Sequence, residues 1–266
     1  MPYRSDYVRP KKSLGQHFLR DKSVARRIVD SLSDNQKTVL EIGPGTGVLT
    51  EYLLERPDIN LYAIEIDRDS VPYLQQHFPL LTSHLIEGDF LQLDLDKLFQ
   101  EPFAVIGNFP YNISSQIFFK VLEYRNQIPE LVGMIQKEVA ERIAEKPGSK
   151  TYGILSVLIQ AFYDVEYLFT VHENVFVPPP KVKSAAIRFT RNDVQQLDCD
   201  EKLFTRAVKT TFNQRRKTIR NSLKPLVGND AIAAHPFLDL RPERLSVADF
   251  VELTNFVEPY VKKQAL

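Results

Sequence analysis

The stretch NFPYNIS (108–114) directly follows the apolar run FAVIG (103–107). Its amide, two aromatic rings and proline exceed what an ordinary turn needs, because Asn, Pro and Gly suffice for a turn. A packed core would also avoid the asparagine. The combination predicts that a flat, polar molecule is held at the end of a buried strand.

The amine of adenine is a chemical partner that suits these residues. It is a poor nucleophile because its lone pair is delocalised into the ring, so its reaction depends on geometry more than on acid or base catalysis. If Asn108 and a neighbouring backbone carbonyl each accept one N–H, the nitrogen keeps a lone pair directed at an electrophile. Tyr111 would stack on the base, and Pro110 would fix the turn that presents both. Such a base must be flipped out of a duplex or already unpaired.

A second aromatic ring would close a sandwich around the base. Our candidate is Phe176, in the segment VFVPPPKVKS (175–184). The alternative is that Phe176 is a core residue and that the three prolines lead rigidly into a strand.

Three further strand ends predict a nucleoside pocket. LEIGPGTGVLT (40–50) places Gly43, Gly45 and Gly47 at a strand-to-helix turn, where glycine lets the backbone approach a ligand. Glu65 ends the next strand, 22 residues after Gly43, where a carboxylate can accept both hydroxyls of a ribose. Asp89 follows the third strand and can accept the amine of an adenine, with Phe90 beside the ring. Helix N-caps are the alternative reading of both acids.

The spacing of the glycines separates two ligand classes. A dinucleotide fold uses G-x-G-x-x-G, whereas this loop reads E-x-G-x-G-x-G with Glu41 in the strand. An acid there would repel a pyrophosphate and favour the sulfonium and ammonium of S-adenosylmethionine. The loop therefore indicates a methyl donor, and a nicotinamide dehydrogenase is the weaker alternative.

The order of apolar runs predicts an α/β fold that positions these strand ends. Short β-branched runs alternate with amphipathic ones from about residue 38 to 146, which is typical of a mostly parallel, doubly wound sheet. Two later runs, 165–171 and 184–190, predict an antiparallel pair at the sheet edge, giving seven strands in all. After about residue 191 only helical patterns remain, at 201–212, 215–226 and 246–257. We therefore expect one domain over 1–190 and a small all-helical domain over 191–266.

Composition and charge restrict the partners. The chain has 266 residues, 43% of them hydrophobic and 26% charged, and no apolar run long enough for a membrane span or a signal peptide, so we expect a cytoplasmic protein. The single cysteine, Cys199, and the scattered histidines predict no disulfide and no metal site. Net charge is zero, but residues 1–27 hold eight Lys or Arg against two acids, and 202–224 hold eight against none. Two cationic segments on an otherwise acidic body predict a nucleic-acid partner.

Seven segments in order resemble one known family, the ribosomal RNA adenine N6-dimethyltransferases, and its bacterial small-subunit members in particular. They are KKSLGQHFL, LEIGPGTGVLT, AIEID, EGDFL, IGNFPYNISS, FVPPPKVKSAAI and FNQRRKTIRNSL. The resemblance implies a Rossmann-like class I methyltransferase that uses S-adenosylmethionine without a metal. Its implied reaction is dimethylation of two adjacent adenines in the hairpin loop near the 3′ end of 16S rRNA, in the 30S subunit or its precursor.

The resemblance also implies roles for individual residues. Gln16, His17 and Leu19 of GQHFL would cover the cofactor, although the family often has Asn at the position of His17. Asn108 would lie between cofactor and target. The basic residues expected to hold phosphates form two groups, Lys11 and Lys12 in an N-terminal arm of about 1–20, and Arg215, Arg216, Lys217 and Arg220 at the start of a helix.

Two other readings share much of this pattern. The related enzymes that methylate large-subunit rRNA and give macrolide resistance have a similar glycine loop and Asn-aromatic-Pro-aromatic signature. An RNA-binding assembly factor without catalysis is the non-enzymatic alternative, which the complete set of pocket residues disfavours. A monomer is expected, because no apolar stripe is long enough to require a dimer.

Overall fold

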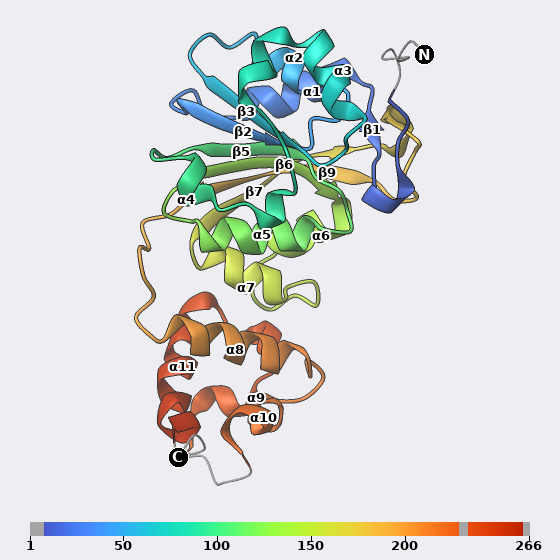
Figure 1. Cartoon of the computed structure of the whole chain (residues 1–266). Helices are drawn as coiled ribbons and strands as arrows, with labels where there is room; N and C mark the ends of the chain where they lie inside the picture. Colours follow the sequence, from blue (N-terminus) through green and yellow to red (C-terminus); the bar gives the residue numbers. More distant parts are fainter. Residues whose placement is uncertain (1–7, 229–233, 263–266) are drawn as a thin grey trace. The chain divides into compact units, whose positions relative to one another are not determined.

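The computed structural model describes residues 8–228 and 234–262, and the chain divides into two compact units (Figure 1). The first comprises Met1–Ala140 and Val165–Arg191, and the second comprises Glu141–Asp164 and Asn192–Leu266. The second unit thus includes a segment that the sequence assigned to the first domain. The segment differs from the prediction because it contains an unpredicted helix, α7 (Ile154–Gln160), which packs on the C-terminal helices α8 (Glu201–Phe212) and α11 (Val247–Lys262).

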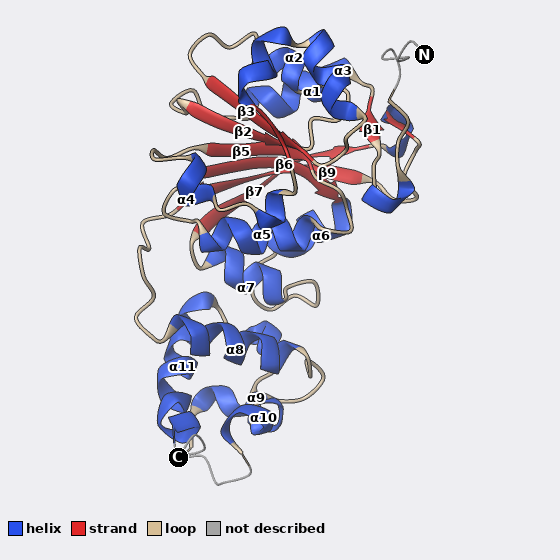
Figure 2. Cartoon of the chain, viewed as in Figure 1, coloured by secondary structure: helices blue, strands red, loops and turns tan. Residues whose placement is uncertain are grey.

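A seven-stranded sheet forms the centre of the first unit, with the strand order β4-β3-β2-β5-β6-β9-β7 (Figure 2). The strands are β2 (Thr38–Ile42), β3 (Asn60–Glu65), β4 (Leu85–Glu87), β5 (Ala104–Asn108), β6 (Glu130–Gln136), β7 (Tyr163–Val171) and β9 (Ser184–Arg191). Strands β2 to β6 pair in parallel, whereas β9 pairs with β6 in antiparallel orientation. The predicted Rossmann-like sheet with its closing pair of strands is confirmed.

Helices cover both faces of this sheet, with α1, α2 and α3 on one face and α5 and α6 on the other (Figure 1). The helices are α1 (Lys22–Asp30), α2 (Thr50–Leu53), α3 (Ser70–His77), α4 (Leu95–Leu98), α5 (Ser114–Glu123) and α6 (Lys137–Ala144). Helix α1 shows why they form, since Asp21 caps its first amides at Ser23 and Val24 and its apolar stripe, including Ile28, is buried.

Short elements complete the first unit. Strands β1 (Phe18–Leu19) and β8 (Phe176–Val177) form a separate antiparallel pair that the sequence did not predict, because two residues are too few for a periodic pattern. Short 3₁₀ helices occur at η1 (Lys12–Leu14), η2 (Pro79–His84), η3 (Phe90–Gln92) and η4 (Glu173–Val175).

The second unit contains helices around an aromatic core, and the described part of 192–262 has no strand (Figure 2). The Phe250 ring contacts the rings of Phe204 and Phe212, and all three are buried. The helix predicted over 215–226 is wrong in detail. Residues 213–218 form turns, and two short helices follow, α9 (Ile219–Ser222) and α10 (Lys224–Val227), with Pro225 in the first turn of α10. Two 3₁₀ turns, η5 (Pro236–Asp239) and η6 (Pro242–Arg244), precede α11.

No helix in the described part of the chain is both long enough and apolar enough to cross a lipid bilayer.

Candidate functional site

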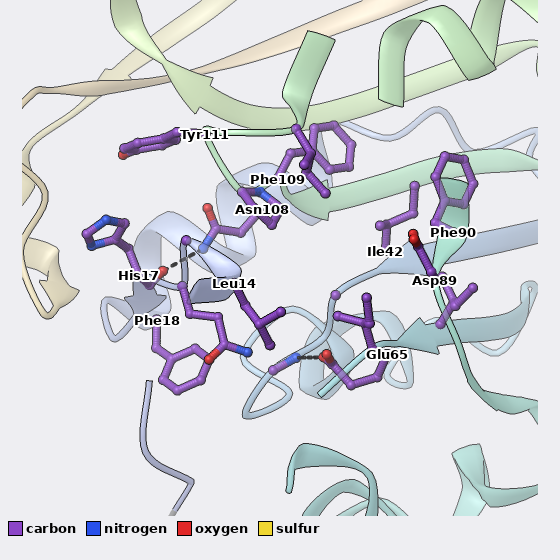
Figure 3. A pocket seen from close by; sticks show the side chains of 18 of the residues that line it. Leu14, His17, Phe18, Ile42, Glu65, Asp89, Phe90, Asn108, Phe109 and Tyr111 are labelled. Atoms are coloured by element: carbon purple, nitrogen blue, oxygen red, sulfur yellow. Dashed lines mark hydrogen bonds between the residues drawn. The ribbon is translucent and has the colours of Figure 1, made fainter. Parts of the chain in front are cut away.

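The candidate site is a pocket at the carboxyl ends of the parallel strands (Figure 3). It encloses about 740 Å³, its open mouth included, which lies in the size range of small-molecule sites. The sequence-predicted residues that line it are Gln16, His17, Gly43, Gly45, Glu65, Asp89, Phe90, Asn108, Pro110 and Tyr111. Segments that are far apart in the sequence thus meet in one cavity because parallel strands end at the same sheet edge.

The glycine loop and Glu65 form one wall. Gly43, Gly45 and Gly47 all have positive φ angles, and a Cβ placed on Gly43 would meet no atom within 4 Å, so the backbone there is open to a ligand. Glu65 is 2% exposed, and its two carboxylate oxygens accept hydrogen bonds from the amides of Gly45 (2.9 Å) and Asp67 (2.8 Å). Each oxygen keeps a further lone pair, which fits the two hydroxyls of a ribose.

The opposite end of the pocket suits an adenine ring. Asp89 accepts a hydrogen bond from the Leu91 amide through one oxygen, at 2.9 Å, so it caps η3 and still has its second oxygen for an amine. The Phe90 side chain is buried beside it, and Ile66 is 49% exposed at the pocket wall. Ile66 was not predicted. The sequence signal for Ile66 is its position, an apolar residue directly after Glu65, the acid that ends β3.

Glu41 requires a correction to the argument from charge. It is buried beneath the glycine loop, and the Thr50 hydroxyl donates a hydrogen bond of 2.6 Å to it. Burial, opposed in part by this hydrogen bond, raises the pKa of Glu41 to about 8. Glu41 is therefore mostly protonated near pH 7, and its charge cannot be what selects a sulfonium over a pyrophosphate.

The raised pKa of Glu41 predicts a pH-dependent stability. The folded protein keeps this proton up to about pH 8, whereas the unfolded chain loses it near its ordinary pKa of 4.5, so the free energy of unfolding falls as pH rises through this interval. Glu41→Gln keeps an acceptor for Thr50 and cannot ionise. We expect it to be more stable than the parent by a few kcal/mol at about pH 8.5 and nearly equal at about pH 4.5, at about 1.4 kcal/mol per pKa unit.

Denaturant unfolding across this pH range measures the effect. The exposed Glu101→Gln is the matched control and should leave the pH profile of the parent unchanged. A Glu41→Gln profile parallel to that of the parent would show that Glu41 is ionised in the folded protein.

Asn108 lies at the end of β5 with its carboxamide oriented by the N-terminal segment. Its Nδ2 donates a hydrogen bond of 2.9 Å to the backbone carbonyl of His17, which directs the Oδ1 acceptor toward the side of the pocket where Tyr111 lies (Figure 3). This is the orientation that an amine donor requires. The sequence predicted the residue, and the structure supplies the partner that fixes its rotamer.

Phe109 anchors the motif on the sheet. Its ring is 1% exposed and covers Gly107 and Gly133, which are partners in adjacent strands; a Cβ on either glycine would collide with the ring. The Phe109 amide also donates a hydrogen bond of 3.0 Å to the Met134 carbonyl. The first aromatic of NFPY therefore has a packing role, and Asn108 and Tyr111 are presented on its two sides.

Tyr111 is held at both its edge and its face. Its hydroxyl lies 2.5 Å from Oγ of the buried Ser184, the first residue of β9. The His17 ring stacks at 5.5 Å between centroids and 27° between planes, and His17 Nδ1 lies 2.7 Å from the carbonyl oxygen of Pro178. The His17 side chain therefore packs on Tyr111 within the pocket lining, and its contact with the cofactor stays a prediction.

The bond to Ser184 changes the result expected for Tyr111→Phe. Stacking alone predicts a mild effect, but loss of the hydroxyl leaves Ser184 without this partner and frees the ring edge. We expect methylation to fall about three- to tenfold, consistent with a net value of about 1 kcal/mol for one hydrogen bond. The methylation rate of Tyr111→Ala should fall much further, about 100-fold, because the stacking surface is also removed.

A double-mutant cycle checks that the effect passes through this bond. Ser184→Ala alone should lower the methylation rate as much as Tyr111→Phe does. The rate of the double variant should be no lower than that of either single variant. Additive losses would show that the two residues act independently.

The N-terminal segment is fastened to the site through Asp67. The Lys11 ammonium forms ion pairs with Asp67 (2.5 Å) and Asp69 (2.8 Å), and the Gln16 side chain donates to Asp67 at 2.9 Å. Burial alone would raise the pKa of Asp67, but the hydrogen bonds from Lys11 and Gln16 outweigh it and lower that pKa. Lys11 is therefore held in intramolecular ion pairs in this structure, and its contact with phosphate stays a prediction. Lys12 is exposed, as a phosphate contact requires.

Two other predicted residues lie away from the pocket. Phe176 and Leu19 are each 2% exposed, pair with each other across β1 and β8, and belong to the hydrophobic core. The structure thus agrees with the core alternative for Phe176, since its ring is covered by packing and does not line the cavity. Leu14 and Phe18 take the wall position that was expected for Leu19.

The predicted RNA-contacting residues of the second unit lie in and after the turn that follows α8. Arg216 and Lys217 are exposed, whereas Arg215 donates a hydrogen bond of 2.7 Å to the Lys150 carbonyl. Arg220 lies 3.5 Å from Asp239. Arg215, Arg216 and Lys217 are therefore presented by a turn, whereas Arg220 lies at the start of the short helix α9.

Within the described residues, no group of three or more metal-ligand side chains comes together. Burial raises the pKa of Cys199 to about 11, which leaves it unreactive as a nucleophile.

Comparison with known proteins decides the family. The family model for ribosomal RNA adenine dimethylase matches residues 8–258. The chain belongs to the ribosomal RNA adenine dimethylase family. It is an adenine N6-dimethyltransferase, and its methyl donor is S-adenosylmethionine.

Relatives of similar length support the same assignment. The chain is 62% identical over 260 residues to the ribosomal RNA small subunit methyltransferase A of Parabacteroides distasonis, covering 97% of each protein. It is 55% identical to the protein of the same name from Porphyromonas gingivalis, over 93% of this chain and 97% of the relative.

Two solved structures share the fold. A dimethyladenosine transferase from Plasmodium falciparum superposes with a TM-score of 0.74 at 24% identity, covering 93% of this chain and 98% of that one. The 23S rRNA methyltransferase ErmE superposes with a TM-score of 0.65 at 25% identity, covering 91% and 99%.

The residues of the pocket fit the methyl donor. The open backbone at Gly43 suits its amino-acid part, Glu65 its ribose hydroxyls, and Asp89 with Phe90 its adenine. S-adenosylmethionine supplies an electrophilic methyl group on a positively charged sulfur.

Proposed function

We propose that this enzyme dimethylates the N6 amines of two adjacent adenines in the hairpin loop near the 3′ end of 16S rRNA, in the 30S subunit or its precursor. The observation that carries the proposal is the Asn108 carboxamide oxygen, turned toward Tyr111 at the mouth of the cofactor pocket. The identity to small-subunit methyltransferases supports the choice of subunit. The enzyme would act as a monomer in the cytoplasm, as a step of small-subunit biogenesis.

Tyr111 and Asn108 would have different roles toward the target adenine, since one would hold the base and the other would orient its amine. Tyr111, fixed by Ser184, would stack on the flipped base. Asn108 Oδ1 and a neighbouring backbone carbonyl, such as that of Pro110, would each accept one N–H of the amine. The amine nitrogen then keeps its lone pair on the side of the methyl donor. The residues would accelerate the transfer by orienting the amine. After the first transfer one N–H remains for the second round.

Phosphate contacts would supply affinity, whereas base choice would come from which loop nucleotides can splay into the pocket. The double reversal Arg215→Glu with Arg216→Glu tests the first part. We expect affinity for 30S subunits to fall about 10- to 100-fold at moderate salt, because two attractive charges become repulsive. Affinity for S-adenosylhomocysteine should not change, because these residues do not line the pocket.

Lys97→Glu is the control for nonspecific charge effects, since Lys97 is 82% exposed and belongs to the other unit. It should bind 30S subunits nearly as the parent does. Equal 30S affinity of the parent and the double variant would contradict the assignment of these arginines to RNA.

Two alternative functions can be distinguished by which rRNA, if any, is methylated. Methylation of 23S rRNA would assign the chain to the class of ErmE, with which it shares the fold. An assembly factor without catalysis would bind subunits and leave both RNAs unmodified.

Primer extension on rRNA from cells with and without this gene tests the proposal in the cell. Dimethylated N6 has lost both of its N–H groups, including the donor of the Watson–Crick edge, and stops reverse transcription. We expect a stop at two adjacent adenines near the 3′ end of 16S rRNA that vanishes on deletion and returns with the gene. A stop that persists after deletion would contradict the proposal.

A further inference from the structure

Lys120 is a buried lysine on α5, with 8% of its surface exposed. Its ammonium donates hydrogen bonds to the backbone carbonyls of Leu91, at 3.1 Å, and of Leu93. It also lies 5.4 Å from the centre of the Phe90 ring, within the range of a cation–π contact. Lysine is rarely buried without partners, and both carbonyl partners here belong to one short segment, 89–93.

The hydrogen bonds of this segment show what Lys120 contributes. The amides of its last three residues find acceptors inside the segment, since Leu91 donates to the Asp89 carboxylate, Gln92 to the Asp89 carbonyl and Leu93 to the Phe90 carbonyl. The carbonyls of Leu91 and Leu93 instead accept hydrogen bonds from the Lys120 ammonium. The segment therefore depends on α5 for the donor to two of its part-buried carbonyls, and the loss of that donor would be costly.

The same segment carries the residues at the adenine end of the pocket. Asp89 and Phe90 both line the cavity, and the Asp89 carboxylate is held in place by the Leu91 amide. Displacement of Leu91 would therefore move the Asp89 oxygen that faces the ligand. Helix α5 begins at Ser114, three residues after Tyr111, so one helix follows the target-side motif and also holds the cofactor-side segment.

We infer that Lys120 is a positioning residue for the cofactor's adenine: its ammonium fixes the segment 89–93 on α5, so that Asp89 can select the adenine amine. The inference rests on the assignment of Asp89 and Phe90 to that adenine. Methionine at this position keeps the apolar stem and removes all donors. The two carbonyls would then have to turn toward water, and the Asp89 carboxylate would lose its fixed position.

Binding of S-adenosylhomocysteine, measured by calorimetry without RNA, tests the inference. We expect Lys120→Met to raise Kd about tenfold, the cost of a misplaced polar contact. The exposed Lys97→Met is the matched control and should bind like the parent. A Kd for Lys120→Met within twofold of the parent would overturn the inference.

A second ligand separates a local effect on adenine recognition from a general loss of structure. S-inosylhomocysteine carries a carbonyl where adenine has its amine, so a fixed Asp89 discriminates against it. The parent should prefer S-adenosylhomocysteine by about 100-fold, and Lys120→Met by less than about tenfold. An unchanged preference with uniformly weaker binding would overturn the inference.

Should Lys120→Met fail to fold, Lys120→Leu provides the same test, because leucine is apolar and has no donor for either carbonyl. An unchanged preference in that variant would likewise overturn the inference. None of these measurements involves RNA. A parent enzyme that binds S-adenosylhomocysteine and methylates no rRNA would refute the proposed function without bearing on Lys120.

Discussion

Asn108→Ala is expected to lower kcat by at least about 100-fold while leaving the Kd for S-adenosylhomocysteine within about threefold of the parent. The carboxamide oxygen is the side-chain acceptor turned toward the target side, and its removal leaves the amine unoriented. The cofactor wall formed by the glycine loop, Glu65 and Asp89 stays intact. Single-turnover methylation of under-methylated 30S subunits, with calorimetry for the cofactor, measures both quantities.

The variant also removes the hydrogen bond to the His17 carbonyl, so a control must separate orientation from packing. Asn108→Asp keeps the size of the side chain but has no N–H for that carbonyl, so it should also be slow. His17→Ala keeps the backbone carbonyl but loses the ring that stacks on Tyr111, so its kcat should fall far less than that of Asn108→Ala and by no more than about tenfold. Full activity of Asn108→Ala would show that the amine is not oriented by this residue.

Glu65→Gln is expected to have the second large effect. It should weaken cofactor binding, whereas Asn108→Ala lowers the rate of methyl transfer. A carboxylate accepts four hydrogen bonds, two of which the amides of Gly45 and Asp67 already supply. Glutamine replaces one oxygen by an NH2 group, which leaves one of these amides facing another donor and removes one acceptor for the ribose hydroxyls. We expect the Kd for S-adenosylhomocysteine to rise about 100-fold, since hydrogen bonds to charged groups are worth about 1.5–3 kcal/mol each.

Glu87→Gln is the matched control, because Glu87 is the partner of Glu65 in the adjacent strand β4 and is exposed. It should bind the cofactor as the parent does. The Tm of both variants should be recorded, because burial raises the pKa of Glu65 and the neutral variant need not be less stable. Unchanged cofactor affinity in Glu65→Gln would remove Glu65 from the ribose site.

The strand-end residues could be predicted because they depend on a rule of the fold. Gly43, Glu65, Asp89 and Asn108 each end or follow a strand, and the ends of parallel strands meet at one edge. Alternating apolar and amphipathic runs were enough to predict that edge. The pocket therefore follows from local patterns along the chain.

Other features depend on contacts between distant segments that no local pattern encodes. Lys11 reads as one basic residue in a cationic arm, yet it pairs with Asp67, 56 residues away. Phe176 is covered because a two-residue strand pairs with Phe18 and Leu19, which is too short to predict. Lys120 occupies a polar position of an amphipathic helix that would be read as solvent-facing. The turn at 213–218 interrupts a sequence whose charges repeat at helical spacing.

The central claim is that this chain transfers methyl groups to small-subunit rRNA, and labelled transfer tests it most directly. Purified under-methylated 30S subunits and, in parallel, 50S subunits would be incubated with the enzyme and S-adenosylmethionine carrying a labelled methyl group. The modified bases would then be mapped. We predict label on two adjacent adenines near the 3′ end of 16S rRNA and none on the 50S subunit. Label confined to 23S rRNA, or no label with the cofactor still bound, would contradict the account.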